Sequence, residues 1–88
     1  MPTICRFYGI LIFMFHGEVG NHRPHFHAQY GGFAASYGID PLTRLSGGLP
    51  QRAERLVMEW ARIHRDELLE NWQRARRREA LLPIYPLD

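Results

Sequence analysis

Apolar residues dominate the start of the chain over residues 3–15. Most of them are β-branched or aromatic, which favours a strand over a helix. Alternation between polar and apolar positions is nearly absent after Gly9, as in a central strand that is covered on both faces. Gly9 itself is typical of a bulge or a bend. We therefore expect a buried strand here.

A clear period of two follows in residues 25–30, His-Phe-His-Ala-Gln-Tyr. Side chains of a strand alternate between its two faces, so His25, His27 and Gln29 would share one face. The two imidazoles would lie about 7 Å apart along the strand and remain available for chemistry. The opposite, core-facing positions are Phe26, Ala28 and Tyr30.

Glycine and proline divide the rest of the first half into short elements. A loop leads from His16 to Pro24, and Pro24 directs Arg23 toward extended geometry. The pattern predicts an antiparallel sheet of three or four strands within residues 1–48. Its later elements are a hairpin turn at Gly31-Gly32, a strand over residues 33–37, a turn at Asp40-Pro41 and a short edge strand over residues 42–45.

Residues 49–79 are expected to be helical, because Gln51 to Arg78 contains neither Gly nor Pro. At about 100° per residue, the apolar stripe of the first half is rotated from that of the second by roughly 90°. This rotation predicts a kink or a break around His64–Asp66, with Asp66 as a cap; one uninterrupted helix is the alternative. The side chains expected to pack on Phe26, Ala28 and Tyr30 are Leu56, Val57 and Trp60.

The composition fits one globular domain of the α+β class over residues 1–88, with 45% hydrophobic residues. Residues 80–88 form an extended tail with apolar side chains. A domain of this size buries little core, so oligomerisation or a partner commonly stabilises it. A homodimer is one such arrangement.

Cys5 is the only cysteine, which excludes an internal disulfide and favours a reducing cytoplasm. The apolar run that ends at Phe15 is too short to span a bilayer, and it lacks the features of a secretory signal. We expect a soluble cytoplasmic protein without a membrane partner. The net charge is +2, and all eleven basic residues are Arg, a side chain suited to bidentate phosphate contacts.

His25 and His27 are the candidate catalytic residues, together with Arg23. Imidazole moves protons near neutral pH, and Arg can hold a phosphate, which is the chemistry of a small metal-independent ribonuclease. A structural role is the alternative, in which the rings hydrogen-bond loops and cap the sheet edge.

A His-x-His pair on a strand can also bind a metal ion, but a site needs at least one more ligand. No candidate completes a recognised ligand spacing, so we predict no metal site and no other cofactor. The candidates considered are His16, Glu18, His22, Asp40 and a residue of a second subunit.

Four arginines, Arg74, Arg76, Arg77 and Arg78, lie at the end of the helical region. They are candidates for binding nucleic acid such as RNA through its phosphates. The alternative is a solvated helix end whose positive charges complement the helix dipole.

Several short segments form a joint pattern along most of the chain. They are Met1-Pro2-Thr3-Ile4, Arg6-Phe7-Tyr8-Gly9-Ile10, Pro24-His25-Phe26-His27-Ala28, Leu49-Pro50 with Arg52-Ala53, Glu59-Trp60-Ala61, and His64-Arg65 with Glu67-Leu68 and Asn71-Trp72. From Met1 to about Arg76 the sequence resembles the small bacterial proteins grouped as domain-of-unknown-function family 4160. Members usually carry two prolines before His-Phe-His, whereas Arg23 replaces the first here.

The resemblance implies a component of a toxin–antitoxin-like gene pair that acts by binding a small partner protein. Such binding would need an exposed apolar patch. Phe13, Phe15 and the tail from Leu81 to Leu87 are the candidates for it. The alternative function is the ribonuclease or nucleic-acid-binding toxin described above, which would use His25 and His27 with Arg23.

Overall fold

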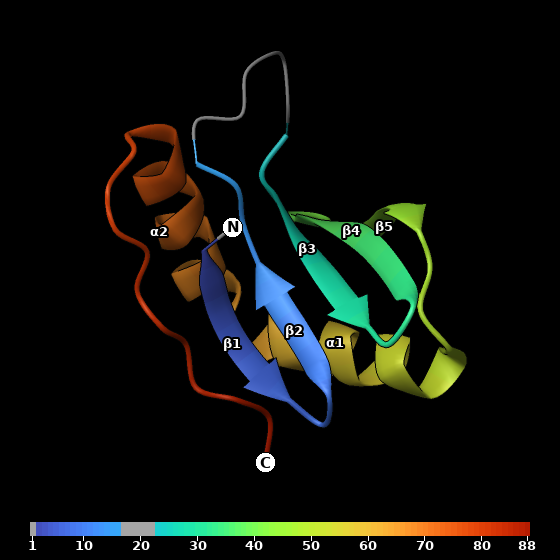
Figure 1. Ribbon diagram of the computed structural model, residues 1–88. Helices are drawn as coiled ribbons and strands as arrows, with labels where there is room; N and C mark the ends of the chain where they lie inside the picture. Colours follow the sequence, from blue (N-terminus) through green and yellow to red (C-terminus); the bar gives the residue numbers. More distant parts are fainter. Residues whose placement is uncertain (1, 17–22) are drawn as a thin grey trace.

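The computed structural model describes residues 2–16 and 23–88, and these residues form a five-stranded antiparallel sheet followed by two helices (Figure 1). The α+β class is therefore confirmed. All five strands pair with their sequence neighbours, in the order β1-β2-β3-β4-β5. The elements are β1 (Thr3–Phe7), β2 (Ile10–Phe13), β3 (His25–Tyr30), β4 (Phe33–Ile39), β5 (Leu42–Gly47), α1 (Gln51–Ile63) and α2 (Arg65–Arg76).

The apolar run at the start forms two strands, so the predicted number of three or four strands is too low. β1 turns back into β2 at Tyr8 and Gly9, whose φ angles are 51° and 79°. Two positive φ angles in a two-residue loop give the type I′ turn, whose twist matches that of paired strands. The sequence hides this turn, because Tyr rarely adopts a positive φ and only Gly9 marks it.

The remaining hairpins are those that the sequence predicts. Tyr30 pairs with Phe33 across Gly31-Gly32, and Ile39 pairs with Leu42 across Asp40-Pro41. The peptide bond between Asp40 and Pro41 is cis. β5 runs two residues further than expected, to Gly47.

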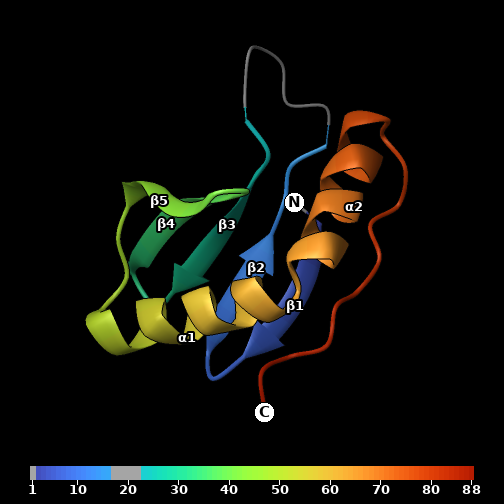
Figure 2. The same cartoon turned by 180° about the vertical axis from the view of Figure 1, so that it is seen from behind.

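Both helices cover one face of the sheet, where the core lies (Figure 2). Trp60 and Val57 are fully buried, and the Trp60 ring lies 6.0 Å from the Phe26 ring. The expected packing of α1 on β3 is thus confirmed for Trp60 and Phe26. The core position expected for Tyr30 is wrong, because this last residue of β3 lies at a hairpin tip and is 36% exposed.

The predicted break in the helical region is confirmed at His64, which separates α1 from α2 with φ −107° and ψ 27°. The expected cap by Asp66 is wrong, since no side chain caps the backbone at the start of α2. Instead, the His64 Nδ1 bonds Glu67 Oε1 at 2.5 Å, one turn into the helix. None of the helices in the described ranges is both long and apolar enough to cross a bilayer.

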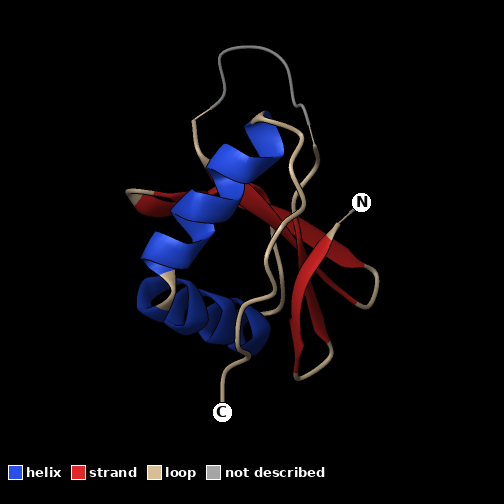
Figure 3. Ribbon diagram, turned by 90° about the vertical axis from the view of Figure 1, so that its left-hand side faces the viewer, coloured by secondary structure: helices blue, strands red, loops and turns tan. Residues whose placement is uncertain are grey.

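The tail passes α2 and then reaches β1 (Figure 3). Buried Asn71 bonds both the N–H and the C=O of Leu82, at 2.9 and 2.8 Å. The Ile84 N–H then donates to the Ile4 carbonyl, and the Trp60 indole N–H donates to the carbonyl of Tyr85. The apolar tail therefore covers the β1 edge of its own chain.

The expected apolar patch is accordingly wrong in part. Phe13 is only 7% exposed, and Ile84 of the tail is buried. Phe15 is exposed as expected, and so are Leu82 and Tyr85 of the tail.

Candidate functional site

His25 begins β3 and is 7% exposed. Its ring lies 4.9 Å from the ring of Trp72 in α2 and 5.1 Å from that of His27. Its Nδ1–H donates to the Arg23 carbonyl at 2.9 Å, so a neutral imidazole carries its lone pair on Nε2. The expectation that both imidazoles lie open on the outer face is wrong for His25, because Trp72 packs against it.

His27 is half-buried among aromatic rings. It pairs with Phe13 of β2 across the sheet, and the two rings stack at 5.3 Å. Phe15 meets the same imidazole edge-on at 4.9 Å. We call Phe13, Phe15, His25, His27 and Trp72 the His–aromatic cluster; it joins β2, β3 and α2.

Arg23 precedes β3 and is exposed. Its aliphatic chain lies over Gly38 of β4, with Cδ 3.5 Å from the position of a β-carbon there. Its backbone carbonyl, and not its guanidinium, holds His25. The three predicted catalytic residues therefore lie together at the start of β3, where Arg23 contacts His25 through its backbone carbonyl.

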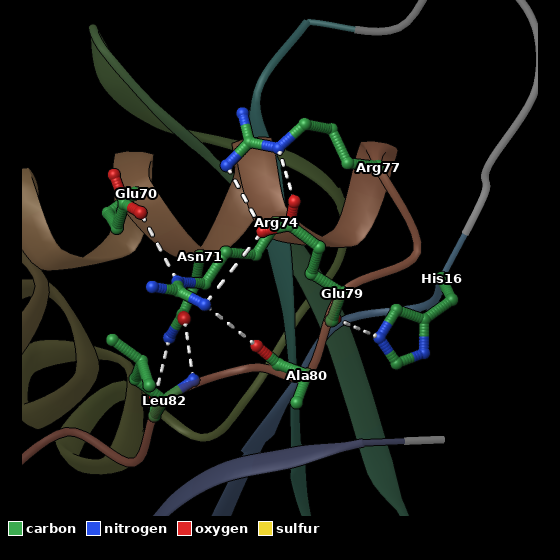
Figure 4. A network of polar contacts seen from close by, with 8 residues as sticks. All are labelled: His16, Glu70, Asn71, Arg74, Arg77, Glu79, Ala80 and Leu82. Carbon is green, nitrogen blue, oxygen red and sulfur yellow. Dashed lines mark hydrogen bonds and ion pairs between the residues drawn. The ribbon is translucent and has the colours of Figure 1, made fainter.

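Two of the four arginines in the predicted cluster, Arg74 and Arg77, are paired with carboxylates (Figure 4). Arg74 lies 3.2 Å from Glu70 and 3.9 Å from Glu79, and Arg77 donates twice to Glu79 at 3.0 and 3.3 Å. The hydrogen bond between Arg77 and Glu79 lowers the pKa of the Glu79 carboxyl and raises the pKa of the Arg77 guanidinium. Arg76 and Arg78 are exposed and form no ion pair with any described residue.

Arg76 is the last residue of α2, the helix that carries Trp72 of the His–aromatic cluster. It follows Trp72 by four residues, so the two side chains are neighbours on one helix face, and Trp72 contacts His25. His16 joins the same region, because its Nε2–H donates to the Glu79 carbonyl at 2.8 Å (Figure 4). The histidine pair and the arginine cluster thus meet at one end of the molecule.

The sequence indicated Phe15 and His16 only for other roles, and it did not place them or Trp72 beside the histidine pair. Trp72 belongs to an apolar stripe of the helical region. Such a stripe predicts that a side chain is buried, but it does not predict which residues the side chain contacts. No local spacing could place it beside His25.

A model of the family described as Domain of unknown function (DUF4160) matches residues 9–73, most of the 88-residue chain. The chain belongs to the DUF4160 family. The expected resemblance is therefore confirmed. The DUF4160 match includes all five members of the His–aromatic cluster, and it ends before Arg74, Arg76 and the tail. Neither the curated proteins nor the solved structures contain a match to this chain.

Metal ligands do not gather in the part of the chain that the structure describes, where no three His, Cys, Asp or Glu side chains form a group. Of the ligands considered, Asp40 lies 3.8 Å from Arg65, and His16 is bonded to a carbonyl. Glu18 and His22 lie outside the described residues. Cys5 is buried, and burial raises the pKa of its thiol, which disfavours the nucleophilic thiolate.

Proposed function

We propose that this protein is one component of a toxin–antitoxin-like pair in the bacterial cytoplasm and acts by binding a small partner protein. The observation that carries the proposal is a group of exposed aromatic side chains at two adjoining hairpin tips. Tyr8 is 54% exposed, Tyr30 36% and Phe33 52%. We call these three residues the tip patch.

The two hairpin tips that carry the tip patch lie against each other. Tyr30 and Phe33 pair across the β3–β4 turn. The Tyr30 ring also lies against the β1–β2 turn, 3.4 Å from the position of a β-carbon on Gly9, which directly follows Tyr8. Aromatic residues are enriched at the centres of protein interfaces, where they bury much area at a small entropic cost.

The expected partner is the small protein encoded beside this one. An 88-residue domain gains stability from a partner that covers such a surface. A buried Cys5, with no second cysteine to pair with, suits a reducing compartment.

The test is titration of the purified partner, followed by calorimetry and size-exclusion chromatography. Phe33→Ala should weaken binding by about fivefold or more, because truncation of an interface anchor costs over about 1 kcal/mol. Phe15→Ala is the matched control, since Phe15 is also exposed but lies beyond the opposite end of β3. Two separate peaks from the wild-type mixture at micromolar concentration, or equal losses in both variants, would refute the proposal.

A second candidate function is metal-independent cleavage of RNA by His25 and His27 with Arg23. The observation that favours it is the 5.1 Å separation of the two imidazole rings beside an exposed arginine. Proton transfer by such a pair would need His27 as the more accessible base. Expression of the wild type should then slow growth and degrade RNA, whereas His27→Ala should not; equal growth and equal RNA integrity would exclude this candidate.

A further inference from the structure

We infer that the end of the molecule where β3 begins binds single-stranded nucleic acid, with Phe15 stacking on a base and Arg23 and Arg76 contacting phosphates. This binding requires neither the partner protein nor cleavage of the strand. Single strands expose both the flat faces of their bases and a line of phosphates, so proteins bind them with exposed aromatic rings beside cationic side chains.

Phe15 has the properties of a stacking platform. The residue is 41% exposed, so part of its side chain is available to a ligand. Phe13 and His27 hold the ring edge-on, at 5.6 and 4.9 Å. Because the ring is already ordered by these contacts, little side-chain entropy remains to be lost when a base stacks on it.

Two arginines flank this platform. Arg23 lies over Gly38 on the β4 side of β3, whereas Phe15 follows β2 on the other side. Arg76 lies one helical turn after Trp72 in α2. Trp72 is linked to Phe15 through the rings of His25 and His27, with successive centroid distances of 4.9, 5.1 and 4.9 Å. The strand would therefore cross the start of β3 between cations on both sides.

The charge around the site is positive among the described residues. The nearby carboxylates, Glu70 and Glu79, lie within ion-pair distance of Arg74 and Arg77. Arg23 and Arg76 form no ion pair with described residues, so their guanidinium groups are available to phosphates. An acidic peptide would match the charge but would not use the aromatic ring.

The experiment measures fluorescence anisotropy of a labelled twelve-nucleotide uridine RNA, at 50 mM salt and then at rising salt concentration. Phe15→Ala and the double variant Arg23→Ala/Arg76→Ala should each weaken binding by about tenfold. The double variant should also reduce the slope of log Kd against log salt by about 1 to 2. Phe15→Tyr keeps the ring and should bind as the wild type does.

Matched controls separate this site from general charge. Arg52→Ala/Arg55→Ala removes the same charge from exposed positions near the start of α1, far from the end of α2 (Figures 1 and 2). Phe33→Ala removes an exposed aromatic ring at the other end of the sheet. Both controls should stay within about twofold of the wild type.

Each outcome decides the inference. Equal binding of a thymidine DNA of the same length would support the inference and extend the ligand to single-stranded DNA. Tighter binding of a duplex, or displacement of the RNA by polyglutamate, would overturn the inference. Equal losses in the controls, or no binding by wild-type protein at 50 μM, would also overturn it. Cleavage of the same RNA, read on a gel, tests the ribonuclease candidate separately, because binding without cleavage refutes only that candidate.

Discussion

Gly47 and Gly31 are two of the three described glycines with a positive φ, and their surroundings differ. Gly47 ends β5 with φ 69°, and a β-carbon there would lie 2.2 Å from the Ala34 carbonyl oxygen. Gly31 has φ 57° but open space around it. Gly32, its neighbour in the turn, has neither a positive φ nor a close contact. Substitutions at these three positions therefore distinguish the energetic cost of backbone strain from that of a steric clash.

Alanine at these positions should destabilise the protein in a graded way. Gly32→Ala should change the free energy of unfolding by less than about 0.5 kcal/mol. Gly31→Ala should cost about 1 kcal/mol from strain alone, and Gly47→Ala about 3 kcal/mol because the clash with backbone is added. Urea unfolding measures all three. Equal losses of stability for the Gly31 and Gly47 variants would show that the contact between position 47 and the Ala34 carbonyl relaxes without cost.

At the scale of elements, one buried amide fixes the tail. Asn71 is 1% exposed, and its side chain matches the backbone N–H and C=O of Leu82, as a neighbouring strand would. The tail residue Ile84 then bonds to β1 through its backbone N–H. Because an exposed strand edge invites pairing with other chains, the docked tail protects the β1 side of the sheet.

Asn71→Ala should release the tail. Loss of two hydrogen bonds and of the packing that they position should lower stability by about 2 kcal/mol. The amide of Ile84 should exchange hydrogen much faster, and a protease should cut the tail first. Gln73→Ala, at an exposed position of the same helix, is the control and should change neither. Unaltered exchange at Ile84 would mean that apolar packing alone holds the tail.

At the scale of the whole molecule, a polar contact ties the sheet to the helical layer. The hydroxyl of fully buried Tyr37 in β4 donates to Glu54 of α1 at 2.9 Å, and Arg44 of β5 lies 3.6 Å from the same carboxylate. Burial, and then the hydrogen bond to Glu54, raise the pKa of Tyr37 well above its ordinary value. The neutral phenol is therefore part of the native state.

Alkaline pH should reveal this contact. Below the unfolded pKa of tyrosine, about 10, Tyr37 is neutral in both states and its contribution is constant. As pH rises above 10, the unfolded chain releases this proton while the native state retains it, so stability falls by up to about 1.4 kcal/mol per pH unit. Relative to Tyr37→Phe, the wild type should lose stability between pH 9 and pH 11 in urea unfolding. If the stability of the wild type and that of Tyr37→Phe fell in parallel with pH, the assignment of this effect to the Tyr37 hydroxyl would be contradicted.

The two ends of the sheet carry different surfaces, and this division belongs to the whole molecule. The tip patch lies at the hairpins β1–β2 and β3–β4, whereas the His–aromatic cluster lies where β3 begins. Their separation along β3 is about 17 Å, from five steps of strand rise. The two surfaces therefore share no residue.

Local patterns in the sequence were sufficient for most elements. The period of two in residues 25–30, the Gly31-Gly32 turn and the rotated stripe around His64 each depend on near neighbours, and the structure has all three. The turn at Tyr8 was not predictable in this way, because its positive φ is fixed by pairing between β1 and β2 and not by a residue that prefers it.

Only the tertiary structure decided which side chains share the candidate site. Alternation gave His25 and His27 a common face, but burial of His25 depends on Trp72, which lies in another element. The same holds for the tail, which the sequence marked as apolar and the fold placed against β1 through Asn71. Periodicity reports how a residue relates to its own strand or helix, whereas contacts between elements depend on packing of the whole chain.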